Sequence, residues 1–128
     1  NSDNKIIGSR RAKDMNHKSL LNSCDIGLST VILNKKIITN KIKFANTSTK
    51  EDYILWLKIT LNNNTIFALK DNLTKWRKLN DSLSSSKIQK FYDGYLVYRK
   101  YMNFSLVKSF IYLISLSFNY VLKEFKNR

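Results

Sequence analysis

The sequence lacks the residues on which several kinds of site depend. It has no proline, one cysteine and one histidine in 128 residues. Cys24 alone cannot form an internal disulfide or a zinc cluster built on several thiolates, and a single cysteine is typical of a reducing compartment. His17 is the only side chain that could act as the base of a Ser–His or Cys–His mechanism. We expect a cytoplasmic protein in which Cys24 is a small buried hydrophobe and His17 lies at the surface.

Acidic residues are also few. Nine Asp and Glu stand against 23 Lys and Arg, which gives a net charge of +14. Such a surface attracts nucleic acid, anionic lipid or phosphorylated ligands, and the charge alone does not choose among them. The 43% hydrophobic content excludes a wholly disordered chain and suffices for one small domain with a modest core. The chain opens at Asn1 with no charged and apolar leader, so we expect no signal peptide.

The first 86 residues alternate short apolar runs with polar turns. Residues 18–23 predict a short helix, and the β-branched run over residues 28–33 predicts a buried strand. Two further strands are expected over residues 65–69 and 73–77, followed by a polar loop over residues 80–86.

A longer helix is predicted to begin near Thr49. Ser48 stands three residues before Glu51, which is the spacing of a capping box, in which each side chain bonds the other residue's backbone amide. Over residues 53–61 apolar side chains point in nearly every direction, so the body of this helix should be enclosed while its first turn stays polar. The run of three asparagines at residues 62–64 should end it.

Two more helices are expected over residues 87–128. Ser86 and Gln89 form a second capping-box pair, and apolar residues follow at helical spacing to about Tyr101. Residues 104–122 carry one charge and a narrow polar stripe, made of Ser105, Lys108, Tyr112, Ser115 and Asn119 and continued by Lys123. We therefore divide the chain into residues 1–86 and a helical extension over residues 87–128 that can lie at a membrane interface.

Three blocks of sequence resemble family 2 glycosyltransferases in their order and spacing. The blocks are residues 23–31, residues 50–57, and residues 73–77 with 80–84. The string Glu-Asp-Tyr-Ile-Leu-Trp-Leu at residues 51–57 is the most specific of them, and the resemblance runs from about Ser19 to the C-terminus. It implies an α/β fold, namely the acceptor-side, C-terminal part of a GT-A, Rossmann-like domain with a few-stranded mixed sheet. It also implies transfer with inversion.

The resemblance also assigns roles to individual residues. Asp52 matches the family's catalytic base, which takes the proton from an acceptor hydroxyl as that oxygen attacks the anomeric carbon. The N-terminus of a helix favours an ionised carboxylate at this place. Glu51 matches a partner acid that orients the acceptor. Trp76 and Arg77 match the block that closes over the donor diphosphate, where a guanidinium can pair two phosphate oxygens.

The sequence departs from the family pattern in three ways. It contains no Asp-x-Asp, it lacks the strand-turn-helix that cradles the nucleotide base, and Lys78-Leu79-Asn80 stands where members often have a histidine. The chain is thus expected to be an inactive fragment with no metal ligands of its own. The complete enzyme would use a divalent metal, Mg²⁺ or Mn²⁺, a nucleotide-sugar donor and a glycan or lipid-linked acceptor.

The predicted function is transfer of a sugar in the synthesis of bacterial lipooligosaccharide, lipopolysaccharide or capsule, at the cytoplasmic face of the inner membrane. One alternative is a non-catalytic, basic membrane-surface module, because residues 104–122 have lysines at both ends. Lys108 and the polar stripe favour a helix that lies on the membrane or packs on protein over one that spans.

A second alternative is nucleic-acid binding, suggested by aromatic residues that alternate with lysines over residues 87–101. Against it, the lysines are spread over the whole chain and no nucleic-acid-binding motif occurs. We therefore expect no nucleic-acid partner.

Overall fold

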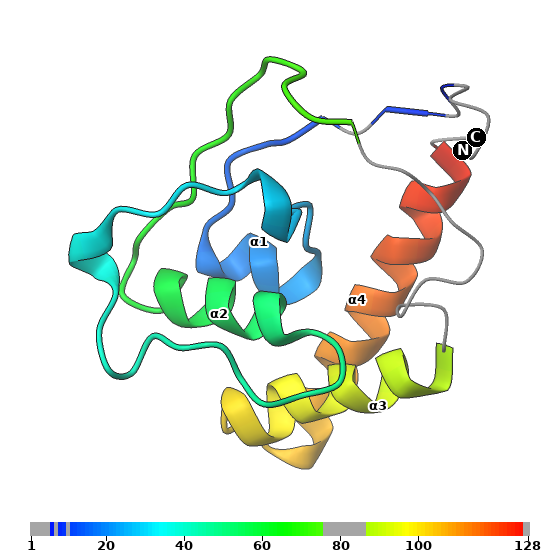
Figure 1. Cartoon of the computed structure of the whole chain (residues 1–128). Coiled ribbons are helices and arrows are strands. Elements are labelled where there is room, and N and C mark those ends of the chain that lie inside the picture. The colour runs from blue at the N-terminus through cyan, green and yellow to red at the C-terminus, as the bar shows by residue number, and fades with distance from the viewer. Residues whose placement is uncertain (1–5, 7, 10, 76–86, 127–128) are drawn as a thin grey trace.

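The computed structural model describes residues 6, 8–9, 11–75 and 87–126. In this part of the chain the structure is helical (Figure 1). Its elements are α1 (His17–Asn22), the 3-10 turns η1 (Leu28–Thr30) and η2 (Lys35–Ile37), α2 (Glu51–Thr60), α3 (Lys87–Leu96), the π-helical turn η3 (Val97–Tyr101) and α4 (Leu106–Lys126). Helix α1 lies between α2 and α4, and α3 crosses the first turns of α4.

Helix α1 confirms the predicted short helix and begins with a capping box. Oδ1 of Asn16 accepts a hydrogen bond from the Ser19 amide at 2.9 Å, and Oγ of Ser19 accepts one from the Asn16 amide at 3.0 Å. A helix of six residues is unstable by itself, because nucleation is costly and few intrahelical bonds repay it. Helix α1 therefore depends on what packs around its other end.

The C-terminal carbonyls of α1 accept hydrogen bonds from two buried tyrosines. The Tyr53 hydroxyl donates to the Leu20 carbonyl at 2.6 Å, and the Tyr98 hydroxyl donates to the Leu21 carbonyl at 2.7 Å. The two hydroxyl oxygens are 2.9 Å apart. The last carbonyls of a helix have no partner inside it, so donors from α2 and η3 serve here instead. These bonds connect three elements at one buried point.

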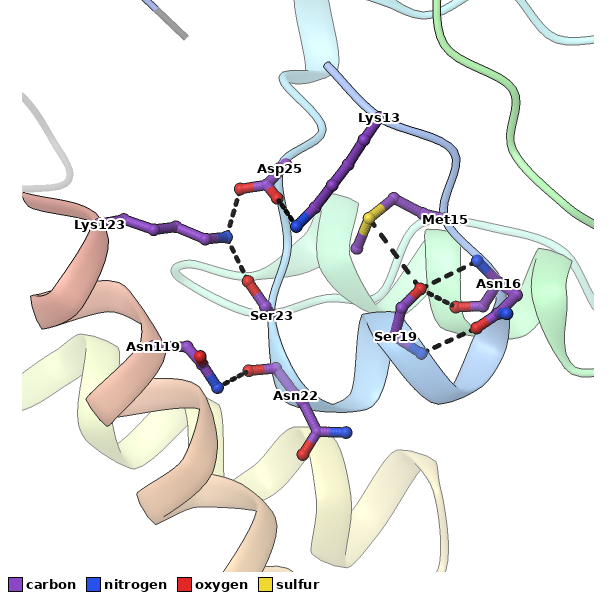
Figure 2. Close-up of polar contacts among 9 residues, drawn as sticks. All are labelled: Lys13, Met15, Asn16, Ser19, Asn22, Ser23, Asp25, Asn119 and Lys123. Carbon is purple, nitrogen blue, oxygen red and sulfur yellow. Dashed lines mark hydrogen bonds and ion pairs between the residues drawn. The ribbon is translucent and has the colours of Figure 1, made fainter. Parts of the chain in front are cut away.

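The polar stripe of α4 faces α1 (Figure 2). Oγ of Ser115 donates to Oδ1 of Asn22 at 2.8 Å, and Nδ2 of Asn119 donates to the Asn22 carbonyl at 3.2 Å. One turn further on, the Lys123 ammonium pairs with the Asp25 carboxylate. The predicted helix and its stripe are therefore confirmed, and this part of the stripe binds the end of α1.

Helix α2 fills the core, as its sequence predicts. Seven of its ten residues are buried, namely Tyr53, Ile54, Leu55, Trp56, Leu57, Ile59 and Thr60. Asn63 adopts a left-handed φ of 61° just beyond the helix, a conformation that asparagine tolerates, and the asparagine run ends α2 as predicted. Val97, Tyr98 and Leu113 belong to the same buried cluster, so η3 and α4 share this core.

The predicted strands do not form in the described residues. Residues 28–33 contain η1 and then extended backbone without a strand partner. Of residues 65–69 only Ile66 pairs, in an antiparallel bridge to Met15 with two hydrogen bonds of 2.9 and 3.0 Å. Residues 73–75 are exposed and not extended into a strand, and residues 76–86 lie outside the described part.

These strand predictions fail for a simple physical reason. A β-branched run becomes a strand only when a neighbouring strand accepts its backbone hydrogen bonds, and the described residues supply no such neighbour. Several apolar side chains in these segments are consequently exposed: Ile32 by 95%, Phe67 by 79% and Leu69 by 68%. The α/β fold class stays a prediction.

The tyrosine pair yields the first testable prediction. Replacing Tyr98 by Phe removes the donor to the buried Leu21 carbonyl, which is left unpaired. We expect a loss of about 1–3 kcal/mol in the free energy of unfolding, measured by urea denaturation followed by circular dichroism. The matched control is Tyr120→Phe, since Tyr120 is on the exposed side of α4. Equal stability of the two variants would contradict the role given to the pair.

Candidate active site

The predicted capping box at the start of α2 is wrong. The helix begins at Glu51, which is its first residue and not its third, and the residue before it, Lys50, has a left-handed φ of 69° and makes no side-chain cap. For a residue with a side chain this conformation costs roughly 1–2 kcal/mol, so the surrounding structure must hold it. Ser48 therefore does not cap the helix.

Asp93 of α3 holds the segment that enters α2. Its Oδ2 accepts hydrogen bonds from the backbone amide and the hydroxyl of Thr49, at 2.9 and 2.7 Å. Its Oδ1 accepts one from Nε2 of Gln89 at 2.9 Å. The side chain is 3% exposed, and bonds to a buried carboxylate are stronger than bonds between neutral groups. Residue Asp93, which our sequence analysis missed, thus fixes the position of the turn before α2.

Asp52 occupies the first turn of α2 and is half-buried. Its Oδ1 accepts a hydrogen bond from the Tyr53 amide at 2.7 Å, and none of the described residues donates one to its Oδ2. One carboxylate oxygen is therefore held by the helix. The other has no hydrogen-bond donor among the described residues and is available to a ligand. Glu51 precedes it in the same turn and is also half-buried. A carboxylate so placed can accept a proton from a bound hydroxyl.

Cys24 and Lys50 lie within electrostatic reach of Asp52. Burial raises the pKa of the Cys24 thiol to about 11, and the negative charge of Asp52 acts in the same direction. The thiol is therefore protonated at neutral pH and is a poor nucleophile. Burial lowers the pKa of Lys50, while the charge of Asp52 opposes that change. The structure thus brings the block at residues 23–31 next to the block at residues 50–57.

A polar hollow of about 400 Å³ lies beside the turn that leads into α2. Its walls come from that turn, from α3 and from η3; they include Thr47, Ser48, Asp93, Lys100 and Tyr101. Asp52 and Glu51 are not among the lining residues. The hollow therefore does not contain the candidate base.

His17 is half-buried at the far end of α2. Its Nδ1 is 3.2 Å from Oγ1 of Thr60, and burial lowers its pKa. A helix rises 1.5 Å per residue, so Thr60 is roughly 12 Å along the axis from Asp52. His17 is therefore not a partner for Asp52, and the expectation that it lies at the surface holds only in part.

The other predicted site residues and the metal need separate statements. Trp76 and Arg77 lie outside the described residues. Within the described ranges, no three His, Cys, Asp or Glu side chains come together in a way that could hold a metal ion. These residues therefore do not fit the divalent metal that the resemblance implies for a complete enzyme.

Asp93 yields the second prediction. Asp93→Asn replaces a charged acceptor of three hydrogen bonds with a neutral amide that can accept through one oxygen only. We expect a loss of about 2–3 kcal/mol in the free energy of unfolding, with faster hydrogen exchange at Thr49 and in the first turn of α2. The control is Asp71→Asn at an exposed bend. Unchanged exchange at Thr49 would show that Asp93 does not hold this turn.

Comparison with known proteins gives one partial similarity. The chain is 35% identical over 91 residues to UDP-Glc:alpha-D-GlcNAc-diphosphoundecaprenol beta-1,3-glucosyltransferase WfgD of Escherichia coli. The match covers 69% of this chain and 35% of that protein, so the chain spans about a third of the length of the curated relative it matches. No family model and no solved structure matches. The similarity supports glycosyl transfer as the class of activity.

Proposed function

We propose that this chain is the acceptor-side, C-terminal part of an inverting family 2 glycosyltransferase of GT-A fold, with Asp52 as its catalytic base. The observation that carries the proposal is the placement of Asp52 in the first turn of α2, with Oδ2 free of hydrogen bonds from the described residues. The partial similarity to a glucosyltransferase supports the same activity class.

In the proposed reaction Oδ2 of Asp52 takes the proton of an acceptor hydroxyl. The hydroxyl oxygen forms a bond to the anomeric carbon of the donor sugar as the bond from that carbon to the diphosphate oxygen breaks. A single displacement of this kind inverts the anomeric centre. The fixed amide bond to Oδ1 orients the carboxylate, and Glu51 next to it is proposed to orient the acceptor.

The rest of the site is proposed to come from outside the described residues. Arg77 would pair with the leaving diphosphate and Trp76 would pack on a sugar ring. The nucleotide pocket and any metal ligands would belong to the remainder of the catalytic domain, so the 128 residues alone are proposed to be inactive.

The segments predicted as strands, residues 28–33 and 65–69, have exposed apolar side chains, which supports the proposal of an incomplete domain. Ile32, Phe67 and Leu69 are more than two-thirds exposed in segments whose backbone has almost no strand partner. We propose that further strands of a mixed sheet pair with residues 28–33 and 65–69 in the complete enzyme and cover these side chains. Pairing would satisfy the backbone and bury the apolar surface in one step.

The proposed substrates are a nucleotide-sugar donor and a lipid-linked glycan acceptor. The relative's name specifies UDP-Glc and a GlcNAc-diphosphoundecaprenol. An acceptor attached to such a lipid would place the reaction at the cytoplasmic face of the inner membrane, in synthesis of a bacterial surface polysaccharide. The excess of 23 Lys and Arg over nine acids suits an anionic membrane surface.

The third prediction tests the base. In a protein that joins this chain to a matching N-terminal catalytic half, Asp52→Asn should lower kcat by about 10²–10⁴-fold, because the amide cannot accept the proton. The dissociation constant of the nucleotide sugar, measured by calorimetry, should change less than about twofold, since Asp52 contacts the acceptor side.

The controls are Glu51→Gln, which keeps the base, and Asp71→Asn at an exposed bend. We expect Asp71→Asn to be fully active and Glu51→Gln to raise KM for the acceptor more than it lowers kcat. Full activity of Asp52→Asn in a well-folded protein would disprove the assignment.

A further inference from the structure

Helix α4 exposes a broad apolar face in addition to the face that packs on the core. Its polar residues Ser115, Asn119 and Lys123 bond to α1 and the residues that follow it. Leu113 lies in the core, but many of the other apolar residues of α4 point away from it. Six of them, spaced by three or four positions over five turns, are 47–71% exposed: Val107, Ile111, Ile114, Phe118, Val121 and Phe125. A helix in water shows the opposite arrangement, so this face requires an apolar cover.

The exposed face of α4 continues into a groove between α4 and α3. The groove has a volume of about 520 Å³ and is lined by Ile88, Phe91, Tyr92, Tyr95 and Phe110. The rings of Tyr95 and Phe110 are 5.2 Å apart and join the two helices. We call the six α4 residues and this groove the outer apolar surface. Its extent over two helices is larger than scattered exposed apolar residues would give.

The charge around this surface indicates what covers it. Residues 87–128 contain eight Lys and Arg against two acids, and one of these acids, Asp93, is buried and hydrogen-bonded. Arg99 and Lys108 are exposed near the start of α4. An apolar face on a segment with a strong excess of cations is complementary to a layer of anionic headgroups above hydrocarbon.

The same charges disfavour a second copy of this chain as the cover. Opposite charges beside the apolar seam favour a helical dimer, whereas Lys108 is the one charge over residues 104–122. Two chains of net charge +14 would also repel one another. The remainder of a catalytic domain is expected on the other side: residues 62–70, which include the exposed Phe67 and Leu69, lie across α1 from α4 (Figure 1).

The hydrogen bonds of α4 favour a helix that lies on the membrane over one that crosses it. Leu106–Lys123 is long and apolar enough to cross, by length and composition alone, and 11% of it is buried. A crossing helix would carry the bonded groups of Asn22 and Asp25 into hydrocarbon, where unpaired polar groups and charges are costly. In a helix parallel to the surface, these groups stay on the protein side.

We propose that the outer apolar surface inserts into the boundary between headgroups and acyl chains of an anionic bilayer, with α4 parallel to the membrane and α1 and α2 on the aqueous side. The inference defines how the chain meets the membrane proposed above. It does not depend on the role of Asp52, because that residue belongs to α2.

The experiment measures binding of the full chain to vesicles by flotation. Vesicles of phosphatidylglycerol with phosphatidylethanolamine are compared with vesicles of phosphatidylcholine. We expect binding to the anionic vesicles, and a loss of at least about tenfold in the partition coefficient for Ile114→Ser with Phe118→Ser, which removes two inserted side chains. The matched control is the double variant Ile32→Ser, Phe67→Ser, which changes two exposed apolar residues outside the outer apolar surface. Its partition coefficient should be within twofold of that of the unmodified chain.

Insertion is separated from surface adsorption with lipids brominated on their acyl chains. The tryptophan introduced by Phe118→Trp should add fluorescence that these lipids quench. The tryptophan introduced by Ile32→Trp should add fluorescence that they do not quench. Circular dichroism confirms that each variant is folded. Absence of vesicle binding by the unmodified chain, equal binding by both double variants, or no quenching of Phe118→Trp would overturn the proposal.

Two further readouts separate the alternatives. Sedimentation tests for a dimer of the unmodified chain. A dimer that the double variant Ile114→Ser, Phe118→Ser abolishes, and that vesicles do not dissociate, would mean that a second copy covers the surface. That result would overturn the proposal. Asp52→Asn should bind vesicles as the unmodified chain does; a loss of binding would contradict the orientation with α2 on the aqueous side. Failure of vesicle binding leaves the test of Asp52 in the joined protein unaffected.

Discussion

The hydrogen bonds of the Tyr53 and Tyr98 hydroxyl groups to the end of α1 are the constraint on which the rest of the structure depends. Each hydroxyl donates to a terminal carbonyl of α1, and the two oxygens are 2.9 Å apart. Burial raises the pKa of both tyrosines, so both stay neutral donors at any physiological pH. A six-residue helix thereby becomes the point to which α2, η3 and α4 are attached, and α2 carries the candidate base.

The same end of α1 determines how α4 is oriented. Asn22 uses both its carbonyl and its side-chain oxygen to accept bonds from α4, and Asp25 pairs with Lys123. Because Ser115, Asn119 and Lys123 turn toward these partners, the apolar residues on the opposite side of α4 face outward. The hydrogen bonds that the polar residues of α4 make inside the protein thus leave the outer apolar surface exposed. A bilayer that covers this surface would stabilise the arrangement. Membrane contact and the position of α2 would then share one structural origin.

Helical periodicity predicts the helices because it depends on neighbours three and four residues apart. It locates α1, α2 and α4, and the polar stripe of α4, without tertiary information. Predictions that depend on distant partners fail: Ser48 loses its capping role because Asp93, 44 residues from Thr49, binds that turn instead. The strands fail because their partners are not among the described residues. Asp52 could be predicted as a site residue from its motif. The roles of Asp93 and Lys50 in positioning the start of α2 could not, because no local sequence pattern indicates them.

Together these features place a carboxylate oxygen of Asp52 at a rigid helix start, which suits a single displacement at an anomeric carbon. The most direct measurement of that claim is the anomeric configuration of the product formed by a complete enzyme containing this chain, read from the proton coupling of the new linkage by nuclear magnetic resonance. An α-linked nucleotide-sugar donor should give a β-linked product. An α-linked product would contradict the account, because retention requires a nucleophile or a front-face reaction and not a base that activates the acceptor.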